Sequence, residues 1–104
     1  MNHPNNAARA LGLIETAGYG AALTAADAAL KAAAVEIVRI EPVIGSGGSL
    51  GVTLYLSGDV ASVQAAVSAG ESEVRRTGRI ISVNVIPNLD TKVKTGMFNN
   101  YLEL

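Results

Sequence analysis

Hydrophobic and polar residues alternate along four stretches of the chain, as expected for β-strands with one buried face. The clearest stretch is 52–57, where valine and leucine alternate with threonine, tyrosine and serine. The other predicted strands cover residues 9–16, 35–43 and 80–86. Pro42 fits a strand that stops or lies at a sheet edge, and Gly12 indicates that another element packs closely against the first strand.

Two stretches between these strands have apolar residues at helical spacing. The first follows a turn at 17–20, and its predicted buried stripe is Leu23, Ala26, Leu30 and Ala33. The second begins after Asp59, a good N-cap, and ends near Gly78, with a buried stripe of Val60, Val63, Val67, Gly70 and Val74. Asp27 and Lys31 stand four residues apart, which predicts a helical ion pair worth about 0.4 kcal/mol on a solvated face.

The resulting order, β-α-β-β-α-β, predicts an α+β fold of the ferredoxin-like type. We expect an antiparallel four-stranded sheet with both helices on one face and a short C-terminal extension. Residues 1–8 are polar and predict a flexible tail, the folded domain spans 9–93, and 94–104 form a C-terminal arm.

Composition adds a second expectation, that the domain buries surface against other subunits. The 104 residues are 49% hydrophobic and only 16% charged, which is an apolar composition for a small single domain. The net charge of -1 argues against nucleic acid or an anionic membrane as partner. The absence of cysteine excludes disulfides and thiolate chemistry, and no signal peptide or membrane-spanning run is apparent, so we expect a cytoplasmic protein.

A stretch of small residues at 44–51 reads Ile-Gly-Ser-Gly-Gly-Ser-Leu-Gly and connects two predicted strands. Its glycines leave backbone amides and the hydroxyls of Ser46 and Ser49 uncovered, so the loop can approach a ligand or copies of itself. It lacks both the lysine of a P-loop and the helix that follows a dinucleotide fingerprint. Taken alone, the stretch fits a flexible hairpin connection best.

The chain offers no arrangement typical of catalysis. Its only histidine, His3, lies in the predicted tail, and its carboxylates are dispersed over different elements. Asp59 is explained as a helix cap, and Glu71 and Glu73 as solvated helix charges. We therefore predict that the protein is not an enzyme and holds no metal or cofactor.

Four motifs, in order and on the expected elements, carry a resemblance to a known family. They are Ala-Leu-Gly-Leu-Ile-Glu-Thr at 10–16, Ala-Ala-Asp-Ala-Ala-Leu-Lys-Ala-Ala at 25–33, Ser-Gly-Asp-Val at 57–60 and Ile-Ser-Val-Asn-Val-Ile-Pro at 81–87. Together they resemble the single-domain, hexamer-forming shell proteins of bacterial microcompartments (BMC-H type). Each motif alone is weak, whereas the set is specific.

The resemblance implies a cyclic homohexamer that tiles, with other shell proteins, into a shell around encapsulated enzymes. Its central pore, for small polar metabolites, would be lined by Gly45, Ser46, Gly47, Gly48 and Ser49. Lys31 and Asn88 would lie at the edge between hexamers. The chain has Ala17, Pro42 and Asn88 where the family usually has basic residues, and its region 41–52 is about four residues longer, which predicts a larger pore loop.

Two other classes of function stay open at this point. One is a small ligand-binding regulatory module that forms a lower oligomer and uses the loop at 44–51 as an anion nest. The other, more remote, is an enzyme built on the dispersed carboxylates, for example Glu15 and Glu41.

Overall fold

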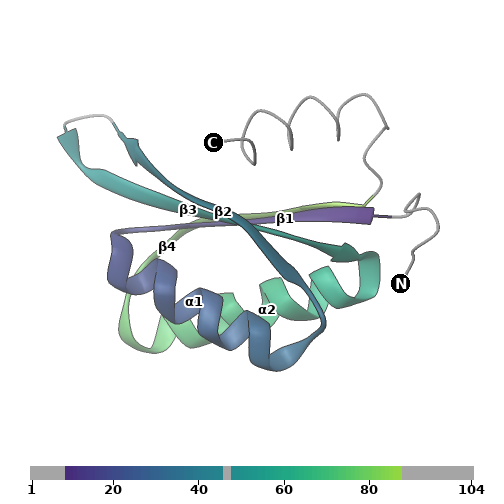
Figure 1. The fold of residues 1–104 in the computed structure, drawn as a ribbon. Helices are drawn as coiled ribbons and strands as arrows, with labels where there is room; N and C mark the ends of the chain where they lie inside the picture. The colour runs from purple at the N-terminus through teal and green to yellow at the C-terminus, as the bar shows by residue number, and fades with distance from the viewer. Residues whose placement is uncertain (1–8, 46–47, 88–104) are drawn as a thin grey trace.

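The computed structural model describes residues 9–45 and 48–87, which form one open sheet with two helices on one side (Figure 1). The elements in chain order are β1 (Arg9–Thr16), α1 (Tyr19–Ala32), β2 (Glu36–Ile44), β3 (Leu50–Asp59), α2 (Val60–Thr77) and β4 (Ile80–Ile86). The strands pair antiparallel in the order β2-β3-β1-β4. The predicted ferredoxin-like α+β fold is confirmed. The predicted tail and C-terminal arm lie outside the described residues.

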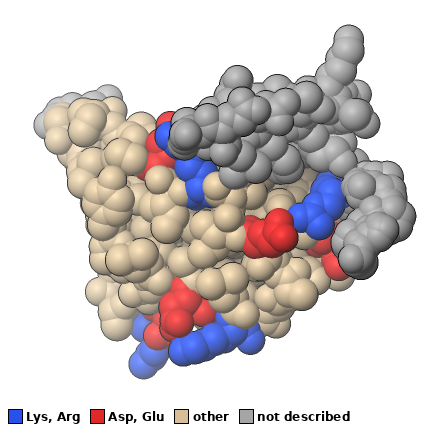
Figure 2. Space-filling model, viewed as in Figure 1, with Lys and Arg blue, Asp and Glu red and all other residues tan. Residues whose placement is uncertain are grey.

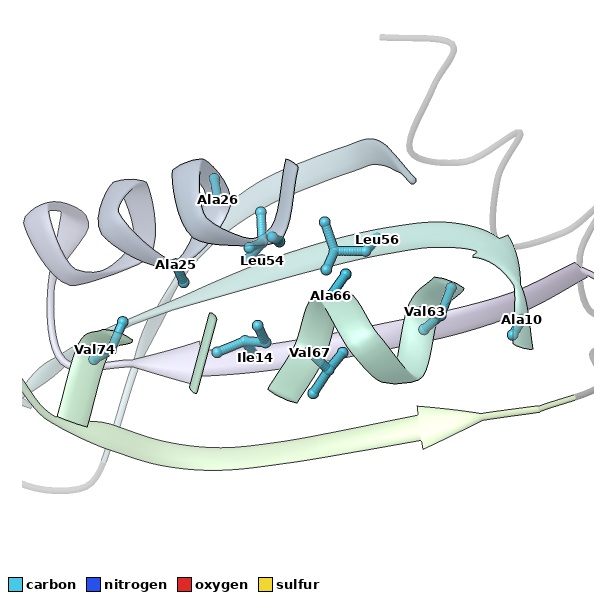
Figure 3. Packing of buried hydrophobic residues seen from close by; sticks show 11 residues of the cluster. Ala10, Ile14, Ala25, Ala26, Leu54, Leu56, Val63, Ala66, Val67 and Val74 are labelled. Atoms are coloured by element: carbon cyan, nitrogen blue, oxygen red, sulfur yellow. The ribbon is translucent and has the colours of Figure 1, made fainter. Parts of the chain in front are cut away.

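The core lies between the sheet and the two helices (Figure 3). Ile14 of β1, Leu54 and Leu56 of β3 and Val63 of α2 are fully buried there. Gly12 makes this packing close, because a Cβ at that position would lie 2.7 Å from Cγ2 of Val67 and 2.8 Å from Cγ1 of Val63. The close approach predicted from this glycine is therefore confirmed.

Helix α1 packs through alanines, and the prediction that Leu23 and Leu30 belong to its buried stripe is wrong. Leu23 is 58% exposed and Leu30 is 49% exposed. The buried residues of α1 are Ala22, Ala25, Ala26 and Ala29. The reason is the close contact of α1 with α2, since a Cβ added at Gly70 would lie 3.1 Å from the carbonyl oxygen of Ala25. Such a narrow space accepts methyl groups and excludes leucine side chains.

Strand β3 is buried on both of its faces, which the alternating pattern did not predict. Its leucines face the helices, but Ser57 and Thr53 on the opposite face are also only 3% and 7% exposed. β3 lies between β2 and β1 in the sheet, and Arg9 of β1 reaches across to Ser57. The guanidinium of Arg9 donates a hydrogen bond of 2.9 Å to the hydroxyl of Ser57, which offsets the cost of burying that polar group.

The ends of α2 match the predicted signals. The carboxylate of Asp59 accepts a 2.9 Å hydrogen bond from the backbone N–H of Ser62, and the N–H of Gly78 donates to the carbonyl of Val74. The hydrogen bonds from Ser62 hold the pKa of Asp59 below its ordinary value. Pro42 lies in β2, the edge strand of the sheet, as predicted.

Candidate functional site

Strands β2 and β3 form a hairpin whose end projects beyond the rest of the sheet (Figure 1). Its ladder continues to the opposed pair Ile44 and Leu50, so only residues 45–49 connect the strands. The N–H of Gly45 donates to the carbonyl of Ser49 at 2.8 Å, and the N–H of Gly48 donates to the carbonyl of Gly45 at 3.1 Å. Gly48 has φ of 81°, a left-handed conformation that favours glycine.

Three of the five predicted pore residues lie at this tip. Gly45, Gly48 and Ser49 are exposed, whereas Ser46 and Gly47 lie outside the described residues. The amides of Gly45 and Gly48 are not left uncovered, as we expected from the sequence, because both donate within the hairpin. Most of region 41–52 is paired strand, so the connection between β2 and β3 is short.

The outer part of the hairpin is apolar and carries no charge. Residues 42–52 contain no acidic or basic side chain, and Figure 2 shows no charged side chain on the described part of the projecting end. Ile44 is 70% exposed, and Val43 and Leu50 are each 41% exposed. We did not single out these three residues from the sequence, although an uncharged run between two strands was a visible signal.

The predicted edge residue Lys31 lies near the end of α1, well away from the hairpin tip. Its Nζ is 3.0 Å from Oδ2 of Asp27, which confirms the predicted ion pair on an exposed face. A shallow groove beside it is lined by Leu23, Thr24, Asp27, Ala28, Lys31 and Glu73. β2 runs from the end of α1 to the tip, and its length puts roughly 30 Å between the two sites. Asn88, the second predicted edge residue, lies outside the described residues.

The carboxylates of the described chain are paired with neighbours one by one. Glu15 accepts from the Ser82 hydroxyl and Glu41 from the Tyr55 hydroxyl, each at 3.2 Å. Glu71 and Glu73 bind arginines of their own helix, as expected for solvated helix charges. Within residues 9–45 and 48–87, no three acidic, histidine or cysteine side chains converge as a metal site would require. His3 lies outside these ranges.

None of the helices described in the structure is long and apolar enough to cross a membrane. The projecting uncharged hairpin and the separate lysine-bearing helix face define a ferredoxin-like domain with surfaces suited to contacts with other chains.

The sequence profile of the BMC domain matches residues 10–89, and the chain belongs to this family as a shell protein of the single-domain type. It is 46% identical to the bacterial microcompartment shell protein PduA of Salmonella typhimurium over 82% of this chain and 86% of that protein. It is 45% identical to the shell protein EutM of Escherichia coli over 75% of this chain and 76% of that protein. With the carboxysome shell protein CcmK2 of Synechococcus elongatus, identity is 47% over 74% of both chains.

A solved structure has the same fold. The crystal structure of a microcompartment protein from Desulfitobacterium hafniense superposes with a TM-score of 0.74 at 32% identity. The match covers 88% of this chain and 48% of that one, so this protein spans about half the length of its structural neighbour.

Proposed function

We propose that this protein forms a cyclic homohexamer that tiles into a microcompartment shell, with the β2–β3 hairpins of its copies around a central pore. Membership of the BMC family supports self-assembly and assembly with other shell proteins. The enclosed enzymes would lie behind this shell, and small polar metabolites would pass through the pore.

The observation that carries this proposal is the projecting hairpin. It ends in Gly45, Gly48 and Ser49, whose small size lets several copies converge on one axis without large side chains blocking the centre. The amides of both glycines donate within the hairpin to the carbonyl oxygens of Ser49 and Gly45, and each of these oxygens keeps a second lone pair that can accept from a solute. Polar groups of this kind around a narrow opening favour small polar solutes over apolar ones.

The edge between hexamers would use the face of α1 that carries Lys31. This lysine is held by Asp27 on an exposed surface, roughly 30 Å of strand away from the tip. The separation supports two independent contacts. One closes the ring of six subunits at the hairpin tip, and the other joins hexamers into a flat layer through the face of α1.

Native mass spectrometry at micromolar concentration tests the subunit number directly, and electron cryomicroscopy of the ring then locates residues 45–49. We expect a hexamer with the five residues nearest the axis. A stable monomer, dimer or trimer would contradict the proposal and would favour a ligand-binding module. Replacing Lys31 with glutamine should weaken the joining of hexamers into a layer while the hexamer persists, because the exposed pair of Lys31 with Asp27 contributes little to the fold.

A further inference from the structure

The end of the β2–β3 hairpin carries apolar surface that its own fold leaves exposed. Ile44 and Leu50 oppose each other in the last pair of the ladder and are 70% and 41% exposed. Val43 is the next residue along β2, so its side chain points to the other face of the hairpin. Apolar side chains on both faces of a projecting two-stranded hairpin indicate a contact with another chain.

We propose that Val43, Ile44 and Leu50 of neighbouring copies pack together and form an apolar collar around the pore loop. The collar rests on the proposed hexamer, because it requires several hairpins around one axis. Each copy contributes the same three side chains, so the ring is incomplete without its partners.

A second copy of this chain is the partner that the surface fits best. Residues 42–52 carry no charge, so identical hairpins approach one another without like-charge repulsion. Ile44 and Leu50 directly flank residues 45–49, so the collar is continuous with the proposed pore.

The exposed leucines of α1 form a different kind of surface. Leu23 and Leu30 are exposed to a similar degree, but the groove beside Leu23 is also lined by Asp27, Lys31 and Glu73. An interface with charges interspersed depends on the complementary charges of its partner. The hairpin end has no such requirement and matches a copy of itself.

The collar has a consequence for what the pore admits. Packed side chains at 43, 44 and 50 would hold the loops at a fixed radius and place an apolar ring next to the polar tip. Apolar constrictions resist hydrated ions, because an ion cannot keep its water shell there. Within the class of small polar metabolites, the collar therefore favours uncharged ones over ions.

Cysteine cross-linking tests the contact, since the native chain has no cysteine. Ile44→Cys places one thiol per subunit at the collar, and Leu23→Cys places one on α1 at a position that is also more than half exposed. In a dilute solution of hexamers, Ile44→Cys should give covalent dimers in high yield under mild oxidation or with a short bis-maleimide. Leu23→Cys should remain uncoupled.

The outcomes separate the collar from the hexamer. A hexamer in which Ile44→Cys resists both reagents would overturn the collar and leave the proposed assembly standing. A chain that forms no hexamer would remove both proposals.

A second pair of variants measures the apolar contribution. Ile44→Thr keeps the β-branched shape and should raise the dissociation constant of the ring by about tenfold per subunit contact. Ile37→Thr makes the same change at the other end of β2 and should shift that constant by less than about twofold. Equal effects of the two variants would contradict the collar.

Discussion

Replacing Gly12 with alanine should destabilise the domain through one identifiable clash. The added methyl group would lie 2.7 Å from Cγ2 of Val67 and 2.8 Å from Cγ1 of Val63, whereas ordinary contact begins at 3.4 Å. Both neighbours are valines of α2, whose side chains have essentially one rotamer in a helix and cannot rotate away. The helix must therefore move by about 0.7 Å, and overpacking of this kind costs about 2 kcal/mol.

Urea denaturation at a fixed protein concentration is the appropriate assay, because association adds to apparent stability. Gly12→Ala should lower the free energy of unfolding by about 2 kcal/mol. Gly20→Ala is the matched control, since nothing lies within 4 Å of its added Cβ, and the gain in helix propensity should stabilise α1 by up to about 1 kcal/mol.

A double-alanine background tests the proposed cause. Val63→Ala and Val67→Ala together remove both contacting methyl groups, so Gly12→Ala in that background should cost at least about 1 kcal/mol less than in the native chain. A Gly12→Ala protein with native stability would refute the reasoning. Simple additivity of Gly12→Ala with the two valine substitutions would also refute it, because the clash would then lie elsewhere.

Three further predictions follow from contacts described in the structure. Thr16→Val should lower the free energy of unfolding by about 1 kcal/mol, because the buried Thr16 hydroxyl lies 3.1 Å from each of two backbone carbonyl oxygens. Thr16→Ser keeps the hydroxyl and should retain most of this stability. Urea denaturation of the two variants would measure the difference. Folding lowers the pKa of Asp59, so the Asp59 cap stabilises the folded domain fully at pH values above the ordinary carboxyl pKa. This stabilisation is lost as pH falls through the lower pKa of the folded state. Asp59→Asn should therefore remove this pH dependence from a plot of unfolding free energy against pH. Lys31→Gln should change the thermal stability of the isolated ring by less than about 0.5 kcal/mol, since its pair with Asp27 is exposed, while light scattering reports weaker sheet formation.

Local signals in the sequence predicted the elements of this fold well. The bounds of β1 and β4, the cap at Asp59 and the end of α2 near Gly78 each depend on a few adjacent residues. Gly12 was informative too, because a glycine inside a strand has few explanations other than close packing or a bulge.

Predictions that depended on the space between elements were less successful. In α1 the leucines at 23 and 30 and the alanines at 22, 25, 26 and 29 form neighbouring stripes, and hydrophobicity alone favours the leucines. The distance between α1 and α2 determines which of these stripes is buried, and Gly70 of α2 sets that distance. Burial of Ser57 likewise depends on a neighbouring strand, because the guanidinium of Arg9 on β1 lies 2.9 Å from the Ser57 hydroxyl, and the alternating pattern of β3 does not encode that contact.

Only part of the candidate site could be predicted from the sequence, because the rest depends on how the strands pair. The glycine and serine residues of the hairpin were found from composition, but which amides are already bonded depends on turn geometry. The exposed apolar pair Ile44 and Leu50 was missed because its exposure results from the length of the ladder.

Pro42 in the edge strand β2 affects how copies of this protein can join. A strand at the edge of a sheet invites another strand to pair with it, and proline interrupts such pairing because it has no N–H to donate. Copies that meet beside the hairpin are therefore less able to form one continuous β-sheet, and they contact each other through side chains instead. Contacts of that kind can close at a defined number of subunits, whereas strand addition leads to open-ended fibrils.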